Sequence, residues 1–238
     1  MSDVNFDAGD VVKPTQSIAD LRVNYDASEL HEEHLAATPL EQFTLWLNDA
    51  IAIGRDALIE PNAMVLSTCN SEGLISSPTV LLKCIDERGL IFYTNYASRK
   101  AQEMHAHPQV TAVFPWYPLH RQVIVSGTTS LISREESAEY FASRPHKSQL
   151  GAIVSTQSTV IESRAILESR MAQLESQYPD GSEIPMPDFW GGFLITVQTM
   201  EFWQGRRSRL HDRLKYSATH ADSRIDNPTD WHVTRLSP

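Results

Sequence analysis

Short apolar segments alternate with polar turns along the middle of the chain. Residues 63–69, 79–85 and 90–95 are rich in apolar and β-branched side chains, and polar turns that end in glycine separate them. Apolar runs joined by short glycine-containing turns are typical of antiparallel strands. The same pattern predicts further strands at 110–114, 122–126, 192–198, 200–203 and 231–236. The chain is therefore expected to form a β-barrel or β-sandwich.

Helices are expected between these strands. Apolar residues recur at helical spacing in 39–53 and in 159–178, and a shorter helix is expected at 98–106. The sequence Ser-Arg-Glu-Glu at 133–136 has the pattern of a capping box, which begins a helix that Pro145 ends. The expected fold class is mainly β with inserted helices, an α+β arrangement on an antiparallel barrel.

The chain divides into a polar arm and one large domain. Residues 1–30 contain several aspartates and show no sustained periodicity, so we expect a flexible N-terminal arm or flap. Residues 31–238 carry the strand and helix patterns, and their length suits a single domain.

Composition excludes several classes of partner. The formal net charge is −10, and an acidic chain is a poor general binder of nucleic acid because phosphate contacts need a positive surface. No run of about 18 apolar residues occurs, so we expect no membrane span. Cys69 and Cys84 lie in apolar runs and are expected to be reduced core cysteines of a cytoplasmic protein. Because there are two of them, a disulfide between them is the alternative. We expect no metal site, because His105 and His107 lack a third ligand.

Two polar clusters are candidate phosphate sites. In the first, an expected strand with Tyr93 and Thr94 leads into a helix whose first turn carries Arg99 and Lys100. A helix N-terminus with two cations suits a phosphate group, although a solvated helix start has the same composition. The second cluster places a phenol, a guanidinium and a hydroxyl together near a helix end, on Tyr140, Arg144 and Ser148. A surface helix end with an isolated arginine is the alternative interpretation.

A third cluster surrounds a glycine turn near the C-terminus. A strand that ends at Trp203 is followed by Gly205 and by a dense group of arginines around His211. Aromatic and guanidinium planes beside a histidine suit an aromatic, anionic ligand, and the alternative is a structural turn. The signatures of a P-loop, a dinucleotide-binding Rossmann site and an α/β-hydrolase nucleophile are missing from the sequence.

Together these motifs resemble the pyridoxine/pyridoxamine 5′-phosphate oxidase family over about residues 22–238. The most specific are Glu-Phe-Trp-Gln-Gly at 201–205, Arg-Leu-His-Asp-Arg at 209–213 and Arg-Leu-Ser-Pro at 235–238. The segments 92–100, 121–123, 148–152, 157–158 and 187–192 also fit, in the same order.

The resemblance implies a split β-barrel homodimer that binds FMN at the subunit interface. It implies oxidation of pyridoxine or pyridoxamine 5′-phosphate to pyridoxal 5′-phosphate by O2, with release of H2O2, and of ammonia from the amine. The implied FMN contacts are Lys83, Tyr93, Thr94, Arg99, Lys100, Gln122, Gln157, Ser158, Trp203 and Arg213.

The resemblance also assigns residues to the substrate. The implied ligands of the substrate phosphate are Lys83, Tyr140, Arg144 and Ser148. Arg209 and His211 are the implied catalytic pair at the pyridine ring. Arg22 and Tyr25 are implied to belong to a flap over the site. The FMN contacts from Arg99 and Lys100 and those from Gln157 and Trp203 are expected to come from opposite subunits.

One departure from the family pattern affects the expected cofactor site. The family has arginine five residues before the lysine at 83, and this chain has Pro78 there, which also removes a strand N–H. This departure leaves open a non-catalytic split barrel that binds pyridoxal phosphate or flavin. A flavin split-barrel reductase that uses a nicotinamide is a third possibility. The set Arg209, Leu210 and His211 favours the oxidase over the reductase.

Overall fold

The computed structural model describes the whole chain except residues 1–24, 26–28, 55 and 59. The described residues form one antiparallel sheet with the strand order β4-β3-β1-β5-β6-β7-β8-β9, and β2 pairs with β1. The strands are β1 (Ala63–Cys69), β2 (Ile75–Ser76), β3 (Thr79–Asp86), β4 (Gly89–Asn95), β5 (Gln109–Trp116), β6 (Arg121–Leu131), β7 (Trp190–Gln204), β8 (Asp212–Ala218) and β9 (Trp231–Arg235).

The sheet closes into a barrel because β4 also pairs with β7. The closing register runs from Leu90 opposite Ile195 to Asn95 opposite Trp190. The second half of β7 pairs with β8 instead, between Thr199 and Gln204. β7 is thus a single strand of 15 residues that belongs to the barrel at one end and to the β8–β9 extension at the other.

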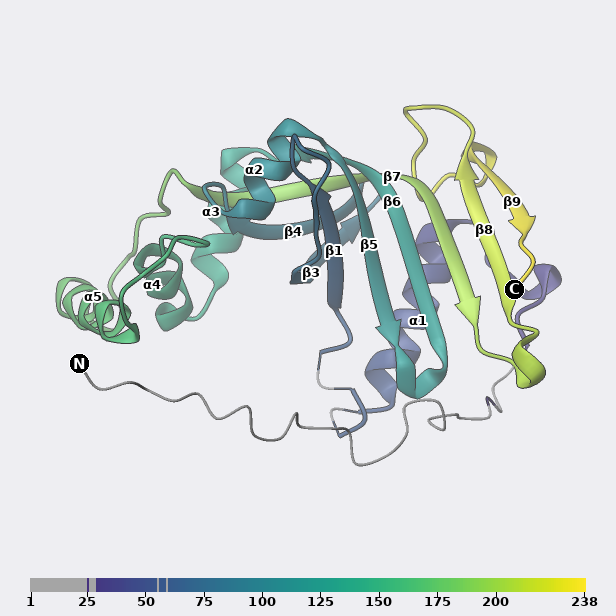
Figure 1. Ribbon diagram of the computed structural model, residues 1–238, viewed down its shortest axis with the longest axis horizontal. Helices are drawn as coiled ribbons and strands as arrows, with labels where there is room; N and C mark the ends of the chain where they lie inside the picture. Colours follow the sequence, from purple (N-terminus) through teal and green to yellow (C-terminus); the bar gives the residue numbers. More distant parts are fainter. Residues whose placement is uncertain (1–24, 26–28, 55, 59) are drawn as a thin grey trace, which may run out of the picture.

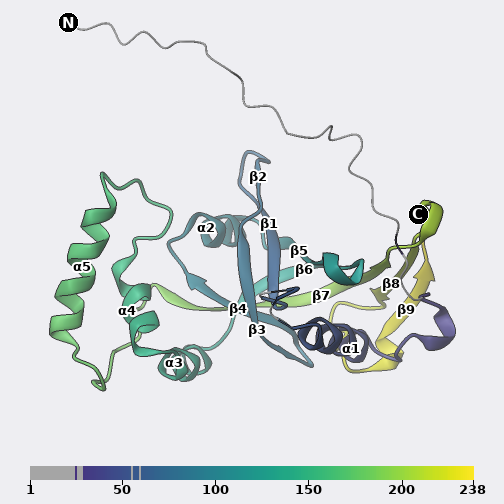
Figure 2. The ribbon, with the colours of Figure 1, turned by 90° about the horizontal axis from the view of Figure 1, so that it is seen from below.

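Five α-helices are inserted in the described part of the chain: α1 (Pro39–Ala52), α2 (Arg99–Ala106), α3 (Arg134–Ser143), α4 (His146–Val154) and α5 (Arg164–Gln177). Figure 1 shows α3, α4 and α5 at one end of the long axis and β8 with β9 at the other. The view from below agrees, and it places α1 beside β8 and β9 (Figure 2). None of the described helices is long and apolar enough to cross a bilayer.

The barrel interior holds the main core. In β1 every second side chain is buried, as expected for a strand with one face towards the core. Helix α1 closes the barrel with Phe43, which is fully buried and meets Phe114 edge to face at 4.9 Å between ring centroids. A second, smaller core lies among α3, α4, α5 and the start of β7, and it contains Phe141, Leu150 and Trp190.

Most of the expected elements are confirmed, but several boundaries were wrong. The expected strands 192–198 and 200–203 are one strand, β7, with a register shift opposite Ser126 and Gly127. The helix expected at 159–178 begins only at Arg164. Helix α4 and strands β2 and β8 were not expected. The capping box is confirmed, because the Glu136 N–H donates to Ser133 Oγ at 3.0 Å.

The two cysteines are free, as expected, but they are not core residues. Cys69 is half-buried and Cys84 is exposed. Cys84 follows an irregularity in the pairing of β3 with β4, where the register shifts between Leu82 and Cys84. This shift interrupts the alternation that would have turned the thiol into the barrel.

Pro78 lies just before β3 rather than inside it. Strand pairing begins at Thr79, and the Pro78 carbonyl accepts a hydrogen bond from the Leu66 N–H at 2.9 Å. A proline at a strand boundary removes no hydrogen bond from the ladder, so the expected cost to strand pairing does not arise.

Candidate active site

A cavity of about 610 Å³ lies where β3 and β4 meet α3, α4 and the start of β7. This volume is in the range of small-molecule sites, about 300–1,000 Å³. It is lined by eight of the expected ligand-binding residues, Lys83, Tyr93, Thr94, Lys100, Tyr140, Arg144, Ser148 and Gln157. The first two polar clusters of the sequence are therefore parts of one site.

Stacked aromatic rings form one wall of the cavity. Tyr93 from β4 stacks on Tyr140 from α3, with 3.9 Å between centroids and 17° between planes. Trp190, the first residue of β7, lies nearly parallel to Tyr93 at 5.4 Å. Burial raises the pKa of Tyr93 to about 12, so its phenol is protonated and can donate a hydrogen bond at neutral pH.

Arg144 is a half-buried cation without a carboxylate partner in the described part of the chain. Its guanidinium carbon lies 4.9 Å from the Trp190 ring centre. Its Nη1 atom is buried and has no hydrogen-bond partner among the described residues. Burial lowers the pKa of Arg144, against the opposing effect of Tyr140. An unsatisfied guanidinium nitrogen beside a cavity is a donor suited to an anionic ligand.

Lys100 is a second buried cation at the same cavity. It is 8% exposed, and Nζ lies 3.4 Å from Thr94 Oγ1. Thr94 Oγ1 in turn donates to Gln157 Oε1 at 3.3 Å. Burial lowers the pKa of Lys100, and Glu103 opposes this. Gln157 was expected on the opposite subunit from Lys100, whereas both side chains line one cavity within one chain.

Lys83 and Ser148 complete the polar side of the cavity. Lys83 lies at the register shift between β3 and β4, and its side chain is exposed at the cavity. Ser148 lies in the first turn of α4, whose backbone begins at Pro145. Arg99 and Ser158 lie next to the cavity residues Lys100 and Gln157 in sequence but do not line the cavity.

Trp190 was not assigned to the site from the sequence, although it forms part of the cavity wall. Its motif, Pro-Asp-Phe-Trp-Gly-Gly at 187–192, was noted only as part of the resemblance. Thr79 and Leu81 were also missed, and both line the cavity with Lys83. Alternation along the expected strand 79–85 was a signal for these two residues.

The third cluster forms a separate group at the turn between β7 and β8. The Trp203 and His211 rings lie 4.7 Å apart, and Tyr25 meets both rings edge to face. Gln122, Trp203 and Arg213 are direct neighbours across β6, β7 and β8. Arg213 Nε donates to Glu201 at 2.7 Å. Arg22, which was expected in the flap, lies outside the described residues.

His211 is held as a neutral imidazole. The Arg206 N–H donates to His211 Nδ1 at 3.0 Å, so the ring hydrogen lies on Nε2. Burial lowers the pKa of His211, and the nearby Arg209 lowers it further. The turn that carries Arg209 is strained, because Ser208 and Arg209 have φ values of 56° and 63° without being glycines.

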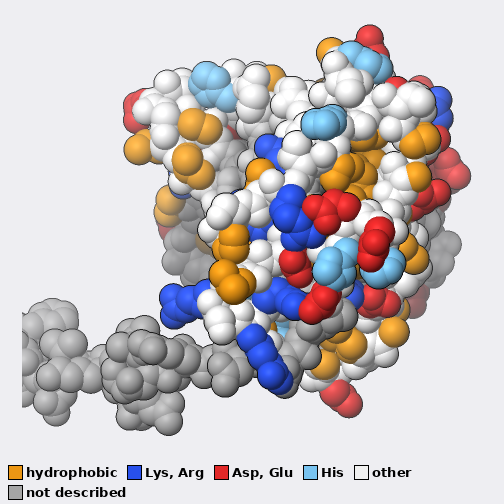
Figure 3. Space-filling model, turned by 90° about the vertical axis from the view of Figure 1, so that its right-hand side faces the viewer, with side chains coloured by type: hydrophobic (Ala, Val, Ile, Leu, Met, Phe, Trp, Pro, Cys, Tyr) orange, Lys and Arg blue, Asp and Glu red, His pale blue; other side chains and the backbone are white. Residues whose placement is uncertain are grey.

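Charged side chains of both signs crowd this end of the molecule (Figure 3). Arg235 pairs with Glu32 at 2.7 Å and with Asp212 at 2.8 Å. Arg206 pairs with Glu29. Arg209, by contrast, is exposed and makes no ion pair within the described ranges.

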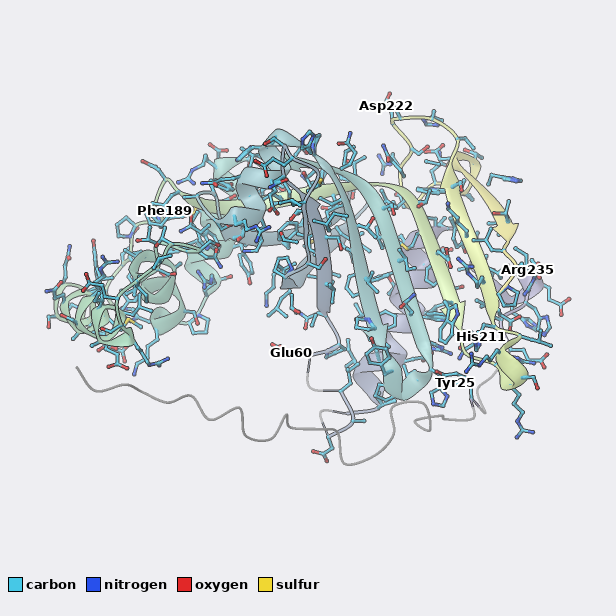
Figure 4. The ribbon with its side chains drawn as sticks, viewed as in Figure 1. Tyr25, Glu60, Phe189, His211, Asp222 and Arg235 are labelled. Carbon is cyan, nitrogen blue, oxygen red and sulfur yellow. The ribbon has the colours of Figure 1, made fainter. Side chains whose placement is uncertain are left out.

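The cavity and the His211 group lie towards opposite ends of the long axis of the molecule. Figure 4 labels Phe189, beside the cavity residue Trp190, and His211 near the other end of the long axis. Trp190 and Trp203 are thirteen residues apart along β7, which is up to roughly 43 Å at about 3.3 Å per residue. Within one chain the two groups are thus separated by nearly the whole length of β7.

Comparison with known families identifies matches over most of the chain. Residues 54–178 match the family described as pyridoxamine 5′-phosphate oxidase. Residues 190–238 match the pyridoxine 5′-phosphate oxidase C-terminal dimerisation region.

Individual relatives agree with these matches. A pyridoxine/pyridoxamine 5′-phosphate oxidase from Streptomyces avermitilis is 50% identical over 226 residues, which cover 94% of this chain and 98% of the relative. A protein of the same name from Rhodopirellula baltica is 48% identical over 92% of this chain and 95% of its own length.

Solved structures agree in fold. PhzG from Burkholderia lata, in complex with tetrahydrophenazine-1-carboxylic acid, has a TM-score of 0.78 and 27% identity, and the match covers 91% of this chain and 100% of PhzG. A pyridoxamine 5′-phosphate oxidase-related, FMN-binding protein from Nostoc punctiforme shares the fold with a TM-score of 0.64 and 14% identity, over 86% of this chain and 100% of its own. The split barrel, the matched regions and the relatives together show that the chain belongs to the pyridoxine/pyridoxamine 5′-phosphate oxidase family.

Proposed function

We propose that this protein is an FMN-dependent oxidase that converts pyridoxine or pyridoxamine 5′-phosphate to pyridoxal 5′-phosphate with O2 as acceptor. The observation that carries the proposal is the buried Nη1 atom of Arg144, which has no hydrogen-bond partner among the described residues, beside the parallel rings of Tyr140 and Trp190. An anion and a planar ring are the two chemical features that this arrangement can bind. Relatives about half identical over nearly the whole chain carry the name of this activity.

The substrate phosphate is assigned to Lys83, Tyr140, Arg144 and Ser148, which share one cavity. Arg144 supplies the buried Nη1 donor, Tyr140 a protonated phenol, and Ser148 a hydroxyl at the first turn of α4. Lys83 adds an exposed cation. Phosphate binding anchors the substrate, and the energy of this contact away from the reacting carbon serves to orient the ring.

The residues at the cavity fit FMN. Lys100 is a buried cation whose one hydrogen bond among the described residues is a long one to Thr94, so it retains donor capacity for an anionic group. Tyr93, Thr94 and Gln157 offer further polar atoms, and Arg99 and Ser158 lie next to them in the chain. When bound, FMN supplies the acceptor of the hydride from the substrate and returns the electrons to O2.

The active site is assigned to the interface of a homodimer. The separation along β7 keeps the cavity and the Trp203–His211 group of one chain apart, and the matched C-terminal dimerisation region supports assembly of two chains. In the proposed dimer, Gln122, Trp203, Arg209, His211 and Arg213 of one protomer complete the cavity of its partner, with Tyr25 covering them. This division differs from the initial expectation only for Gln157.

His211 and Arg209 are assigned to the pyridine ring. With Nδ1 occupied by the Arg206 N–H, His211 presents Nε2–H as a donor to the ring oxygen. Arg209 has an exposed guanidinium that can lie over the ring and stabilise charge that develops there. This side chain extends from a turn in which Ser208 and Arg209 both have left-handed backbone conformations.

The deciding experiment is an oxidase assay of the purified protein with pyridoxine 5′-phosphate, with and without added FMN, following H2O2. We expect a yellow protein that absorbs near 450 nm and produces H2O2 in proportion to aldehyde. A protein that binds flavin or pyridoxal phosphate but makes no H2O2 supports the non-catalytic alternative, which Pro78 motivates. A cytoplasmic location stays a prediction from the sequence.

A further inference from the structure

A buried carboxylate lies on α2, outside the cavity. Glu103 is 4% exposed, and both of its oxygens are occupied. Oε2 accepts hydrogen bonds from Thr68 Oγ1 at 2.5 Å and from Ser76 Oγ at 2.6 Å. Oε1 accepts a hydrogen bond from Arg99 Nε at 2.7 Å. One side chain therefore ties the first turn of α2 to β1 and β2.

Glu103 is charged despite its burial. Burial acts to raise the pKa of Glu103, but the hydrogen bonds from Ser76, Thr68 and Arg99 together hold it below its usual value. A carboxylate beside an anion-binding site opposes the ligand through its charge. The position of Glu103 on α2 is explained if Glu103 holds a cationic side chain that the ligand needs.

The cation in contact with Glu103 is Arg99. The Arg99 side chain is 59% exposed, and such a side chain is usually mobile. Its Nε atom is fixed by Glu103, whereas Nη1 and Nη2 have no partner in the part of the chain that the structure describes. The guanidinium is thus held at one nitrogen and open at the two that can grip a phosphate together.

We propose that Glu103 is a positioning residue that holds the Arg99 guanidinium at the start of α2 for the phosphate of a bound ligand. The inference rests on the proposed function, in which that ligand is FMN. Position 78, two residues beyond Ser76, has proline where the family resemblance expects arginine. With that cation missing, phosphate binding depends more strongly on the fixed orientation of Arg99.

The direction in which Glu103→Ala changes the affinity for FMN distinguishes a positioning role from a purely electrostatic one. If Glu103 acted only through its charge, Glu103→Ala would tighten the binding of an anion. If it positions Arg99, Glu103→Ala weakens binding, because the ligand must then order the Arg99 side chain itself. Ordering a long side chain should raise the Kd roughly tenfold. Glu103→Gln keeps an oxygen for Arg99 Nε and is expected to bind FMN within about threefold of wild type.

The test is a double-mutant cycle on FMN binding, measured by the quenching of flavin fluorescence with apoprotein. Arg99→Ala is expected to raise the Kd by about 10- to 150-fold, the range of one charge-assisted contact. Adding Glu103→Ala to Arg99→Ala is expected to have no further effect, because Glu103 acts through Arg99. Glu168→Ala is the matched control, since it breaks an Arg164–Glu168 pair with the same spacing at 2.8 Å on α5. It should leave the Kd unchanged.

Tighter binding by Glu103→Ala, or an equal weakening in the presence and absence of Arg99, overturns the inference while the proposed function stands. Failure of the wild-type protein to bind FMN overturns both. If urea denaturation shows Glu103→Ala to be unfolded, the same cycle with Ser76→Ala decides. That variant removes one anchor of Glu103 and should weaken FMN binding only when Arg99 is present.

Discussion

Arg144 offers a test in which stability and substrate binding should respond differently. The substitution is Arg144→Met, which keeps the length of the side chain and removes the charge. Arg144 Nη1 is buried and has no hydrogen-bond partner among the described residues, a state that costs about 1–3 kcal/mol. The stacking of the guanidinium on Trp190 at 4.9 Å returns about 0.5–2 kcal/mol. Methionine removes both contributions and still fills the space.

The unfolding free energy of the variant should therefore lie between about 1 kcal/mol below and about 2.5 kcal/mol above that of the wild type, in urea denaturation of the apoprotein. Substrate binding should change in the opposite direction. A charge-assisted contact to phosphate is worth about 1.5–3 kcal/mol, so the KM for pyridoxine 5′-phosphate should rise by about 10- to 150-fold. FMN binding should not change.

Arg144→Lys is the matched control, because it keeps a positive charge but loses the planar fork and its stacking. Its KM should lie between those of the wild type and Arg144→Met. Two results would refute the reasoning. A KM of Arg144→Met within twofold of wild type would remove Arg144 from the substrate site. A loss of more than about 1 kcal/mol in unfolding free energy would make Arg144 a structural residue.

Three other predictions concern the cofactor, the assembly and the pH dependence. Pro78→Arg should tighten FMN by up to about 150-fold in a fluorescence titration with little change in the KM for the B6 phosphate, and equal dissociation constants would mean that another residue already supplies the missing cation. Light scattering should give a homodimer, whereas an active monomer with bound flavin would contradict the assigned interface. The lowered pKa of His211 means that the unfolded chain binds its proton more readily, so stability should fall as the pH drops below about 6.5. His211→Asn, which keeps an acceptor for the Arg206 N–H but does not titrate, should show a smaller fall in unfolding free energy between pH 8 and pH 5.

The barrel strands were predictable because their apolar residues alternate and their turns contain glycine. The range 63–69 matches β1 at both ends. Strand β8 was missed, although Leu214 and Tyr216 alternate with polar residues and are fully buried. The alternation is short, because the arginine-rich turn before Leu214 does not extend it. Helix α4 was missed because Pro145 was interpreted only as the end of α3, whereas it is also the N-cap of α4.

The candidate site was predictable in its residue types but not in its grouping. The first two clusters, around Lys100 and around Arg144, lie more than 40 residues apart in sequence, and only the pairing of β4 with β7 and the packing of α3 bring them to one cavity. The resemblance supplied Gln157 as a ligand, but not its contact with Thr94 of the same chain, to which the segment after α4 returns. Such contacts depend on tertiary packing, which local patterns do not encode.

The length of β7 has a consequence for inheritance. In the proposed dimer, each active site uses the Trp190 end of one strand and the Trp203 end of the other. Consider two inactive chains, one altered at Arg144 and the other at His211. In a dimer of these two chains, one active site would contain both alterations and the other would contain neither. With random mixing of equal amounts, roughly a quarter of all sites would be intact. Two defective alleles of this gene would therefore rescue each other when their lesions lie at opposite ends of the strand, and would fail to do so when they share an end.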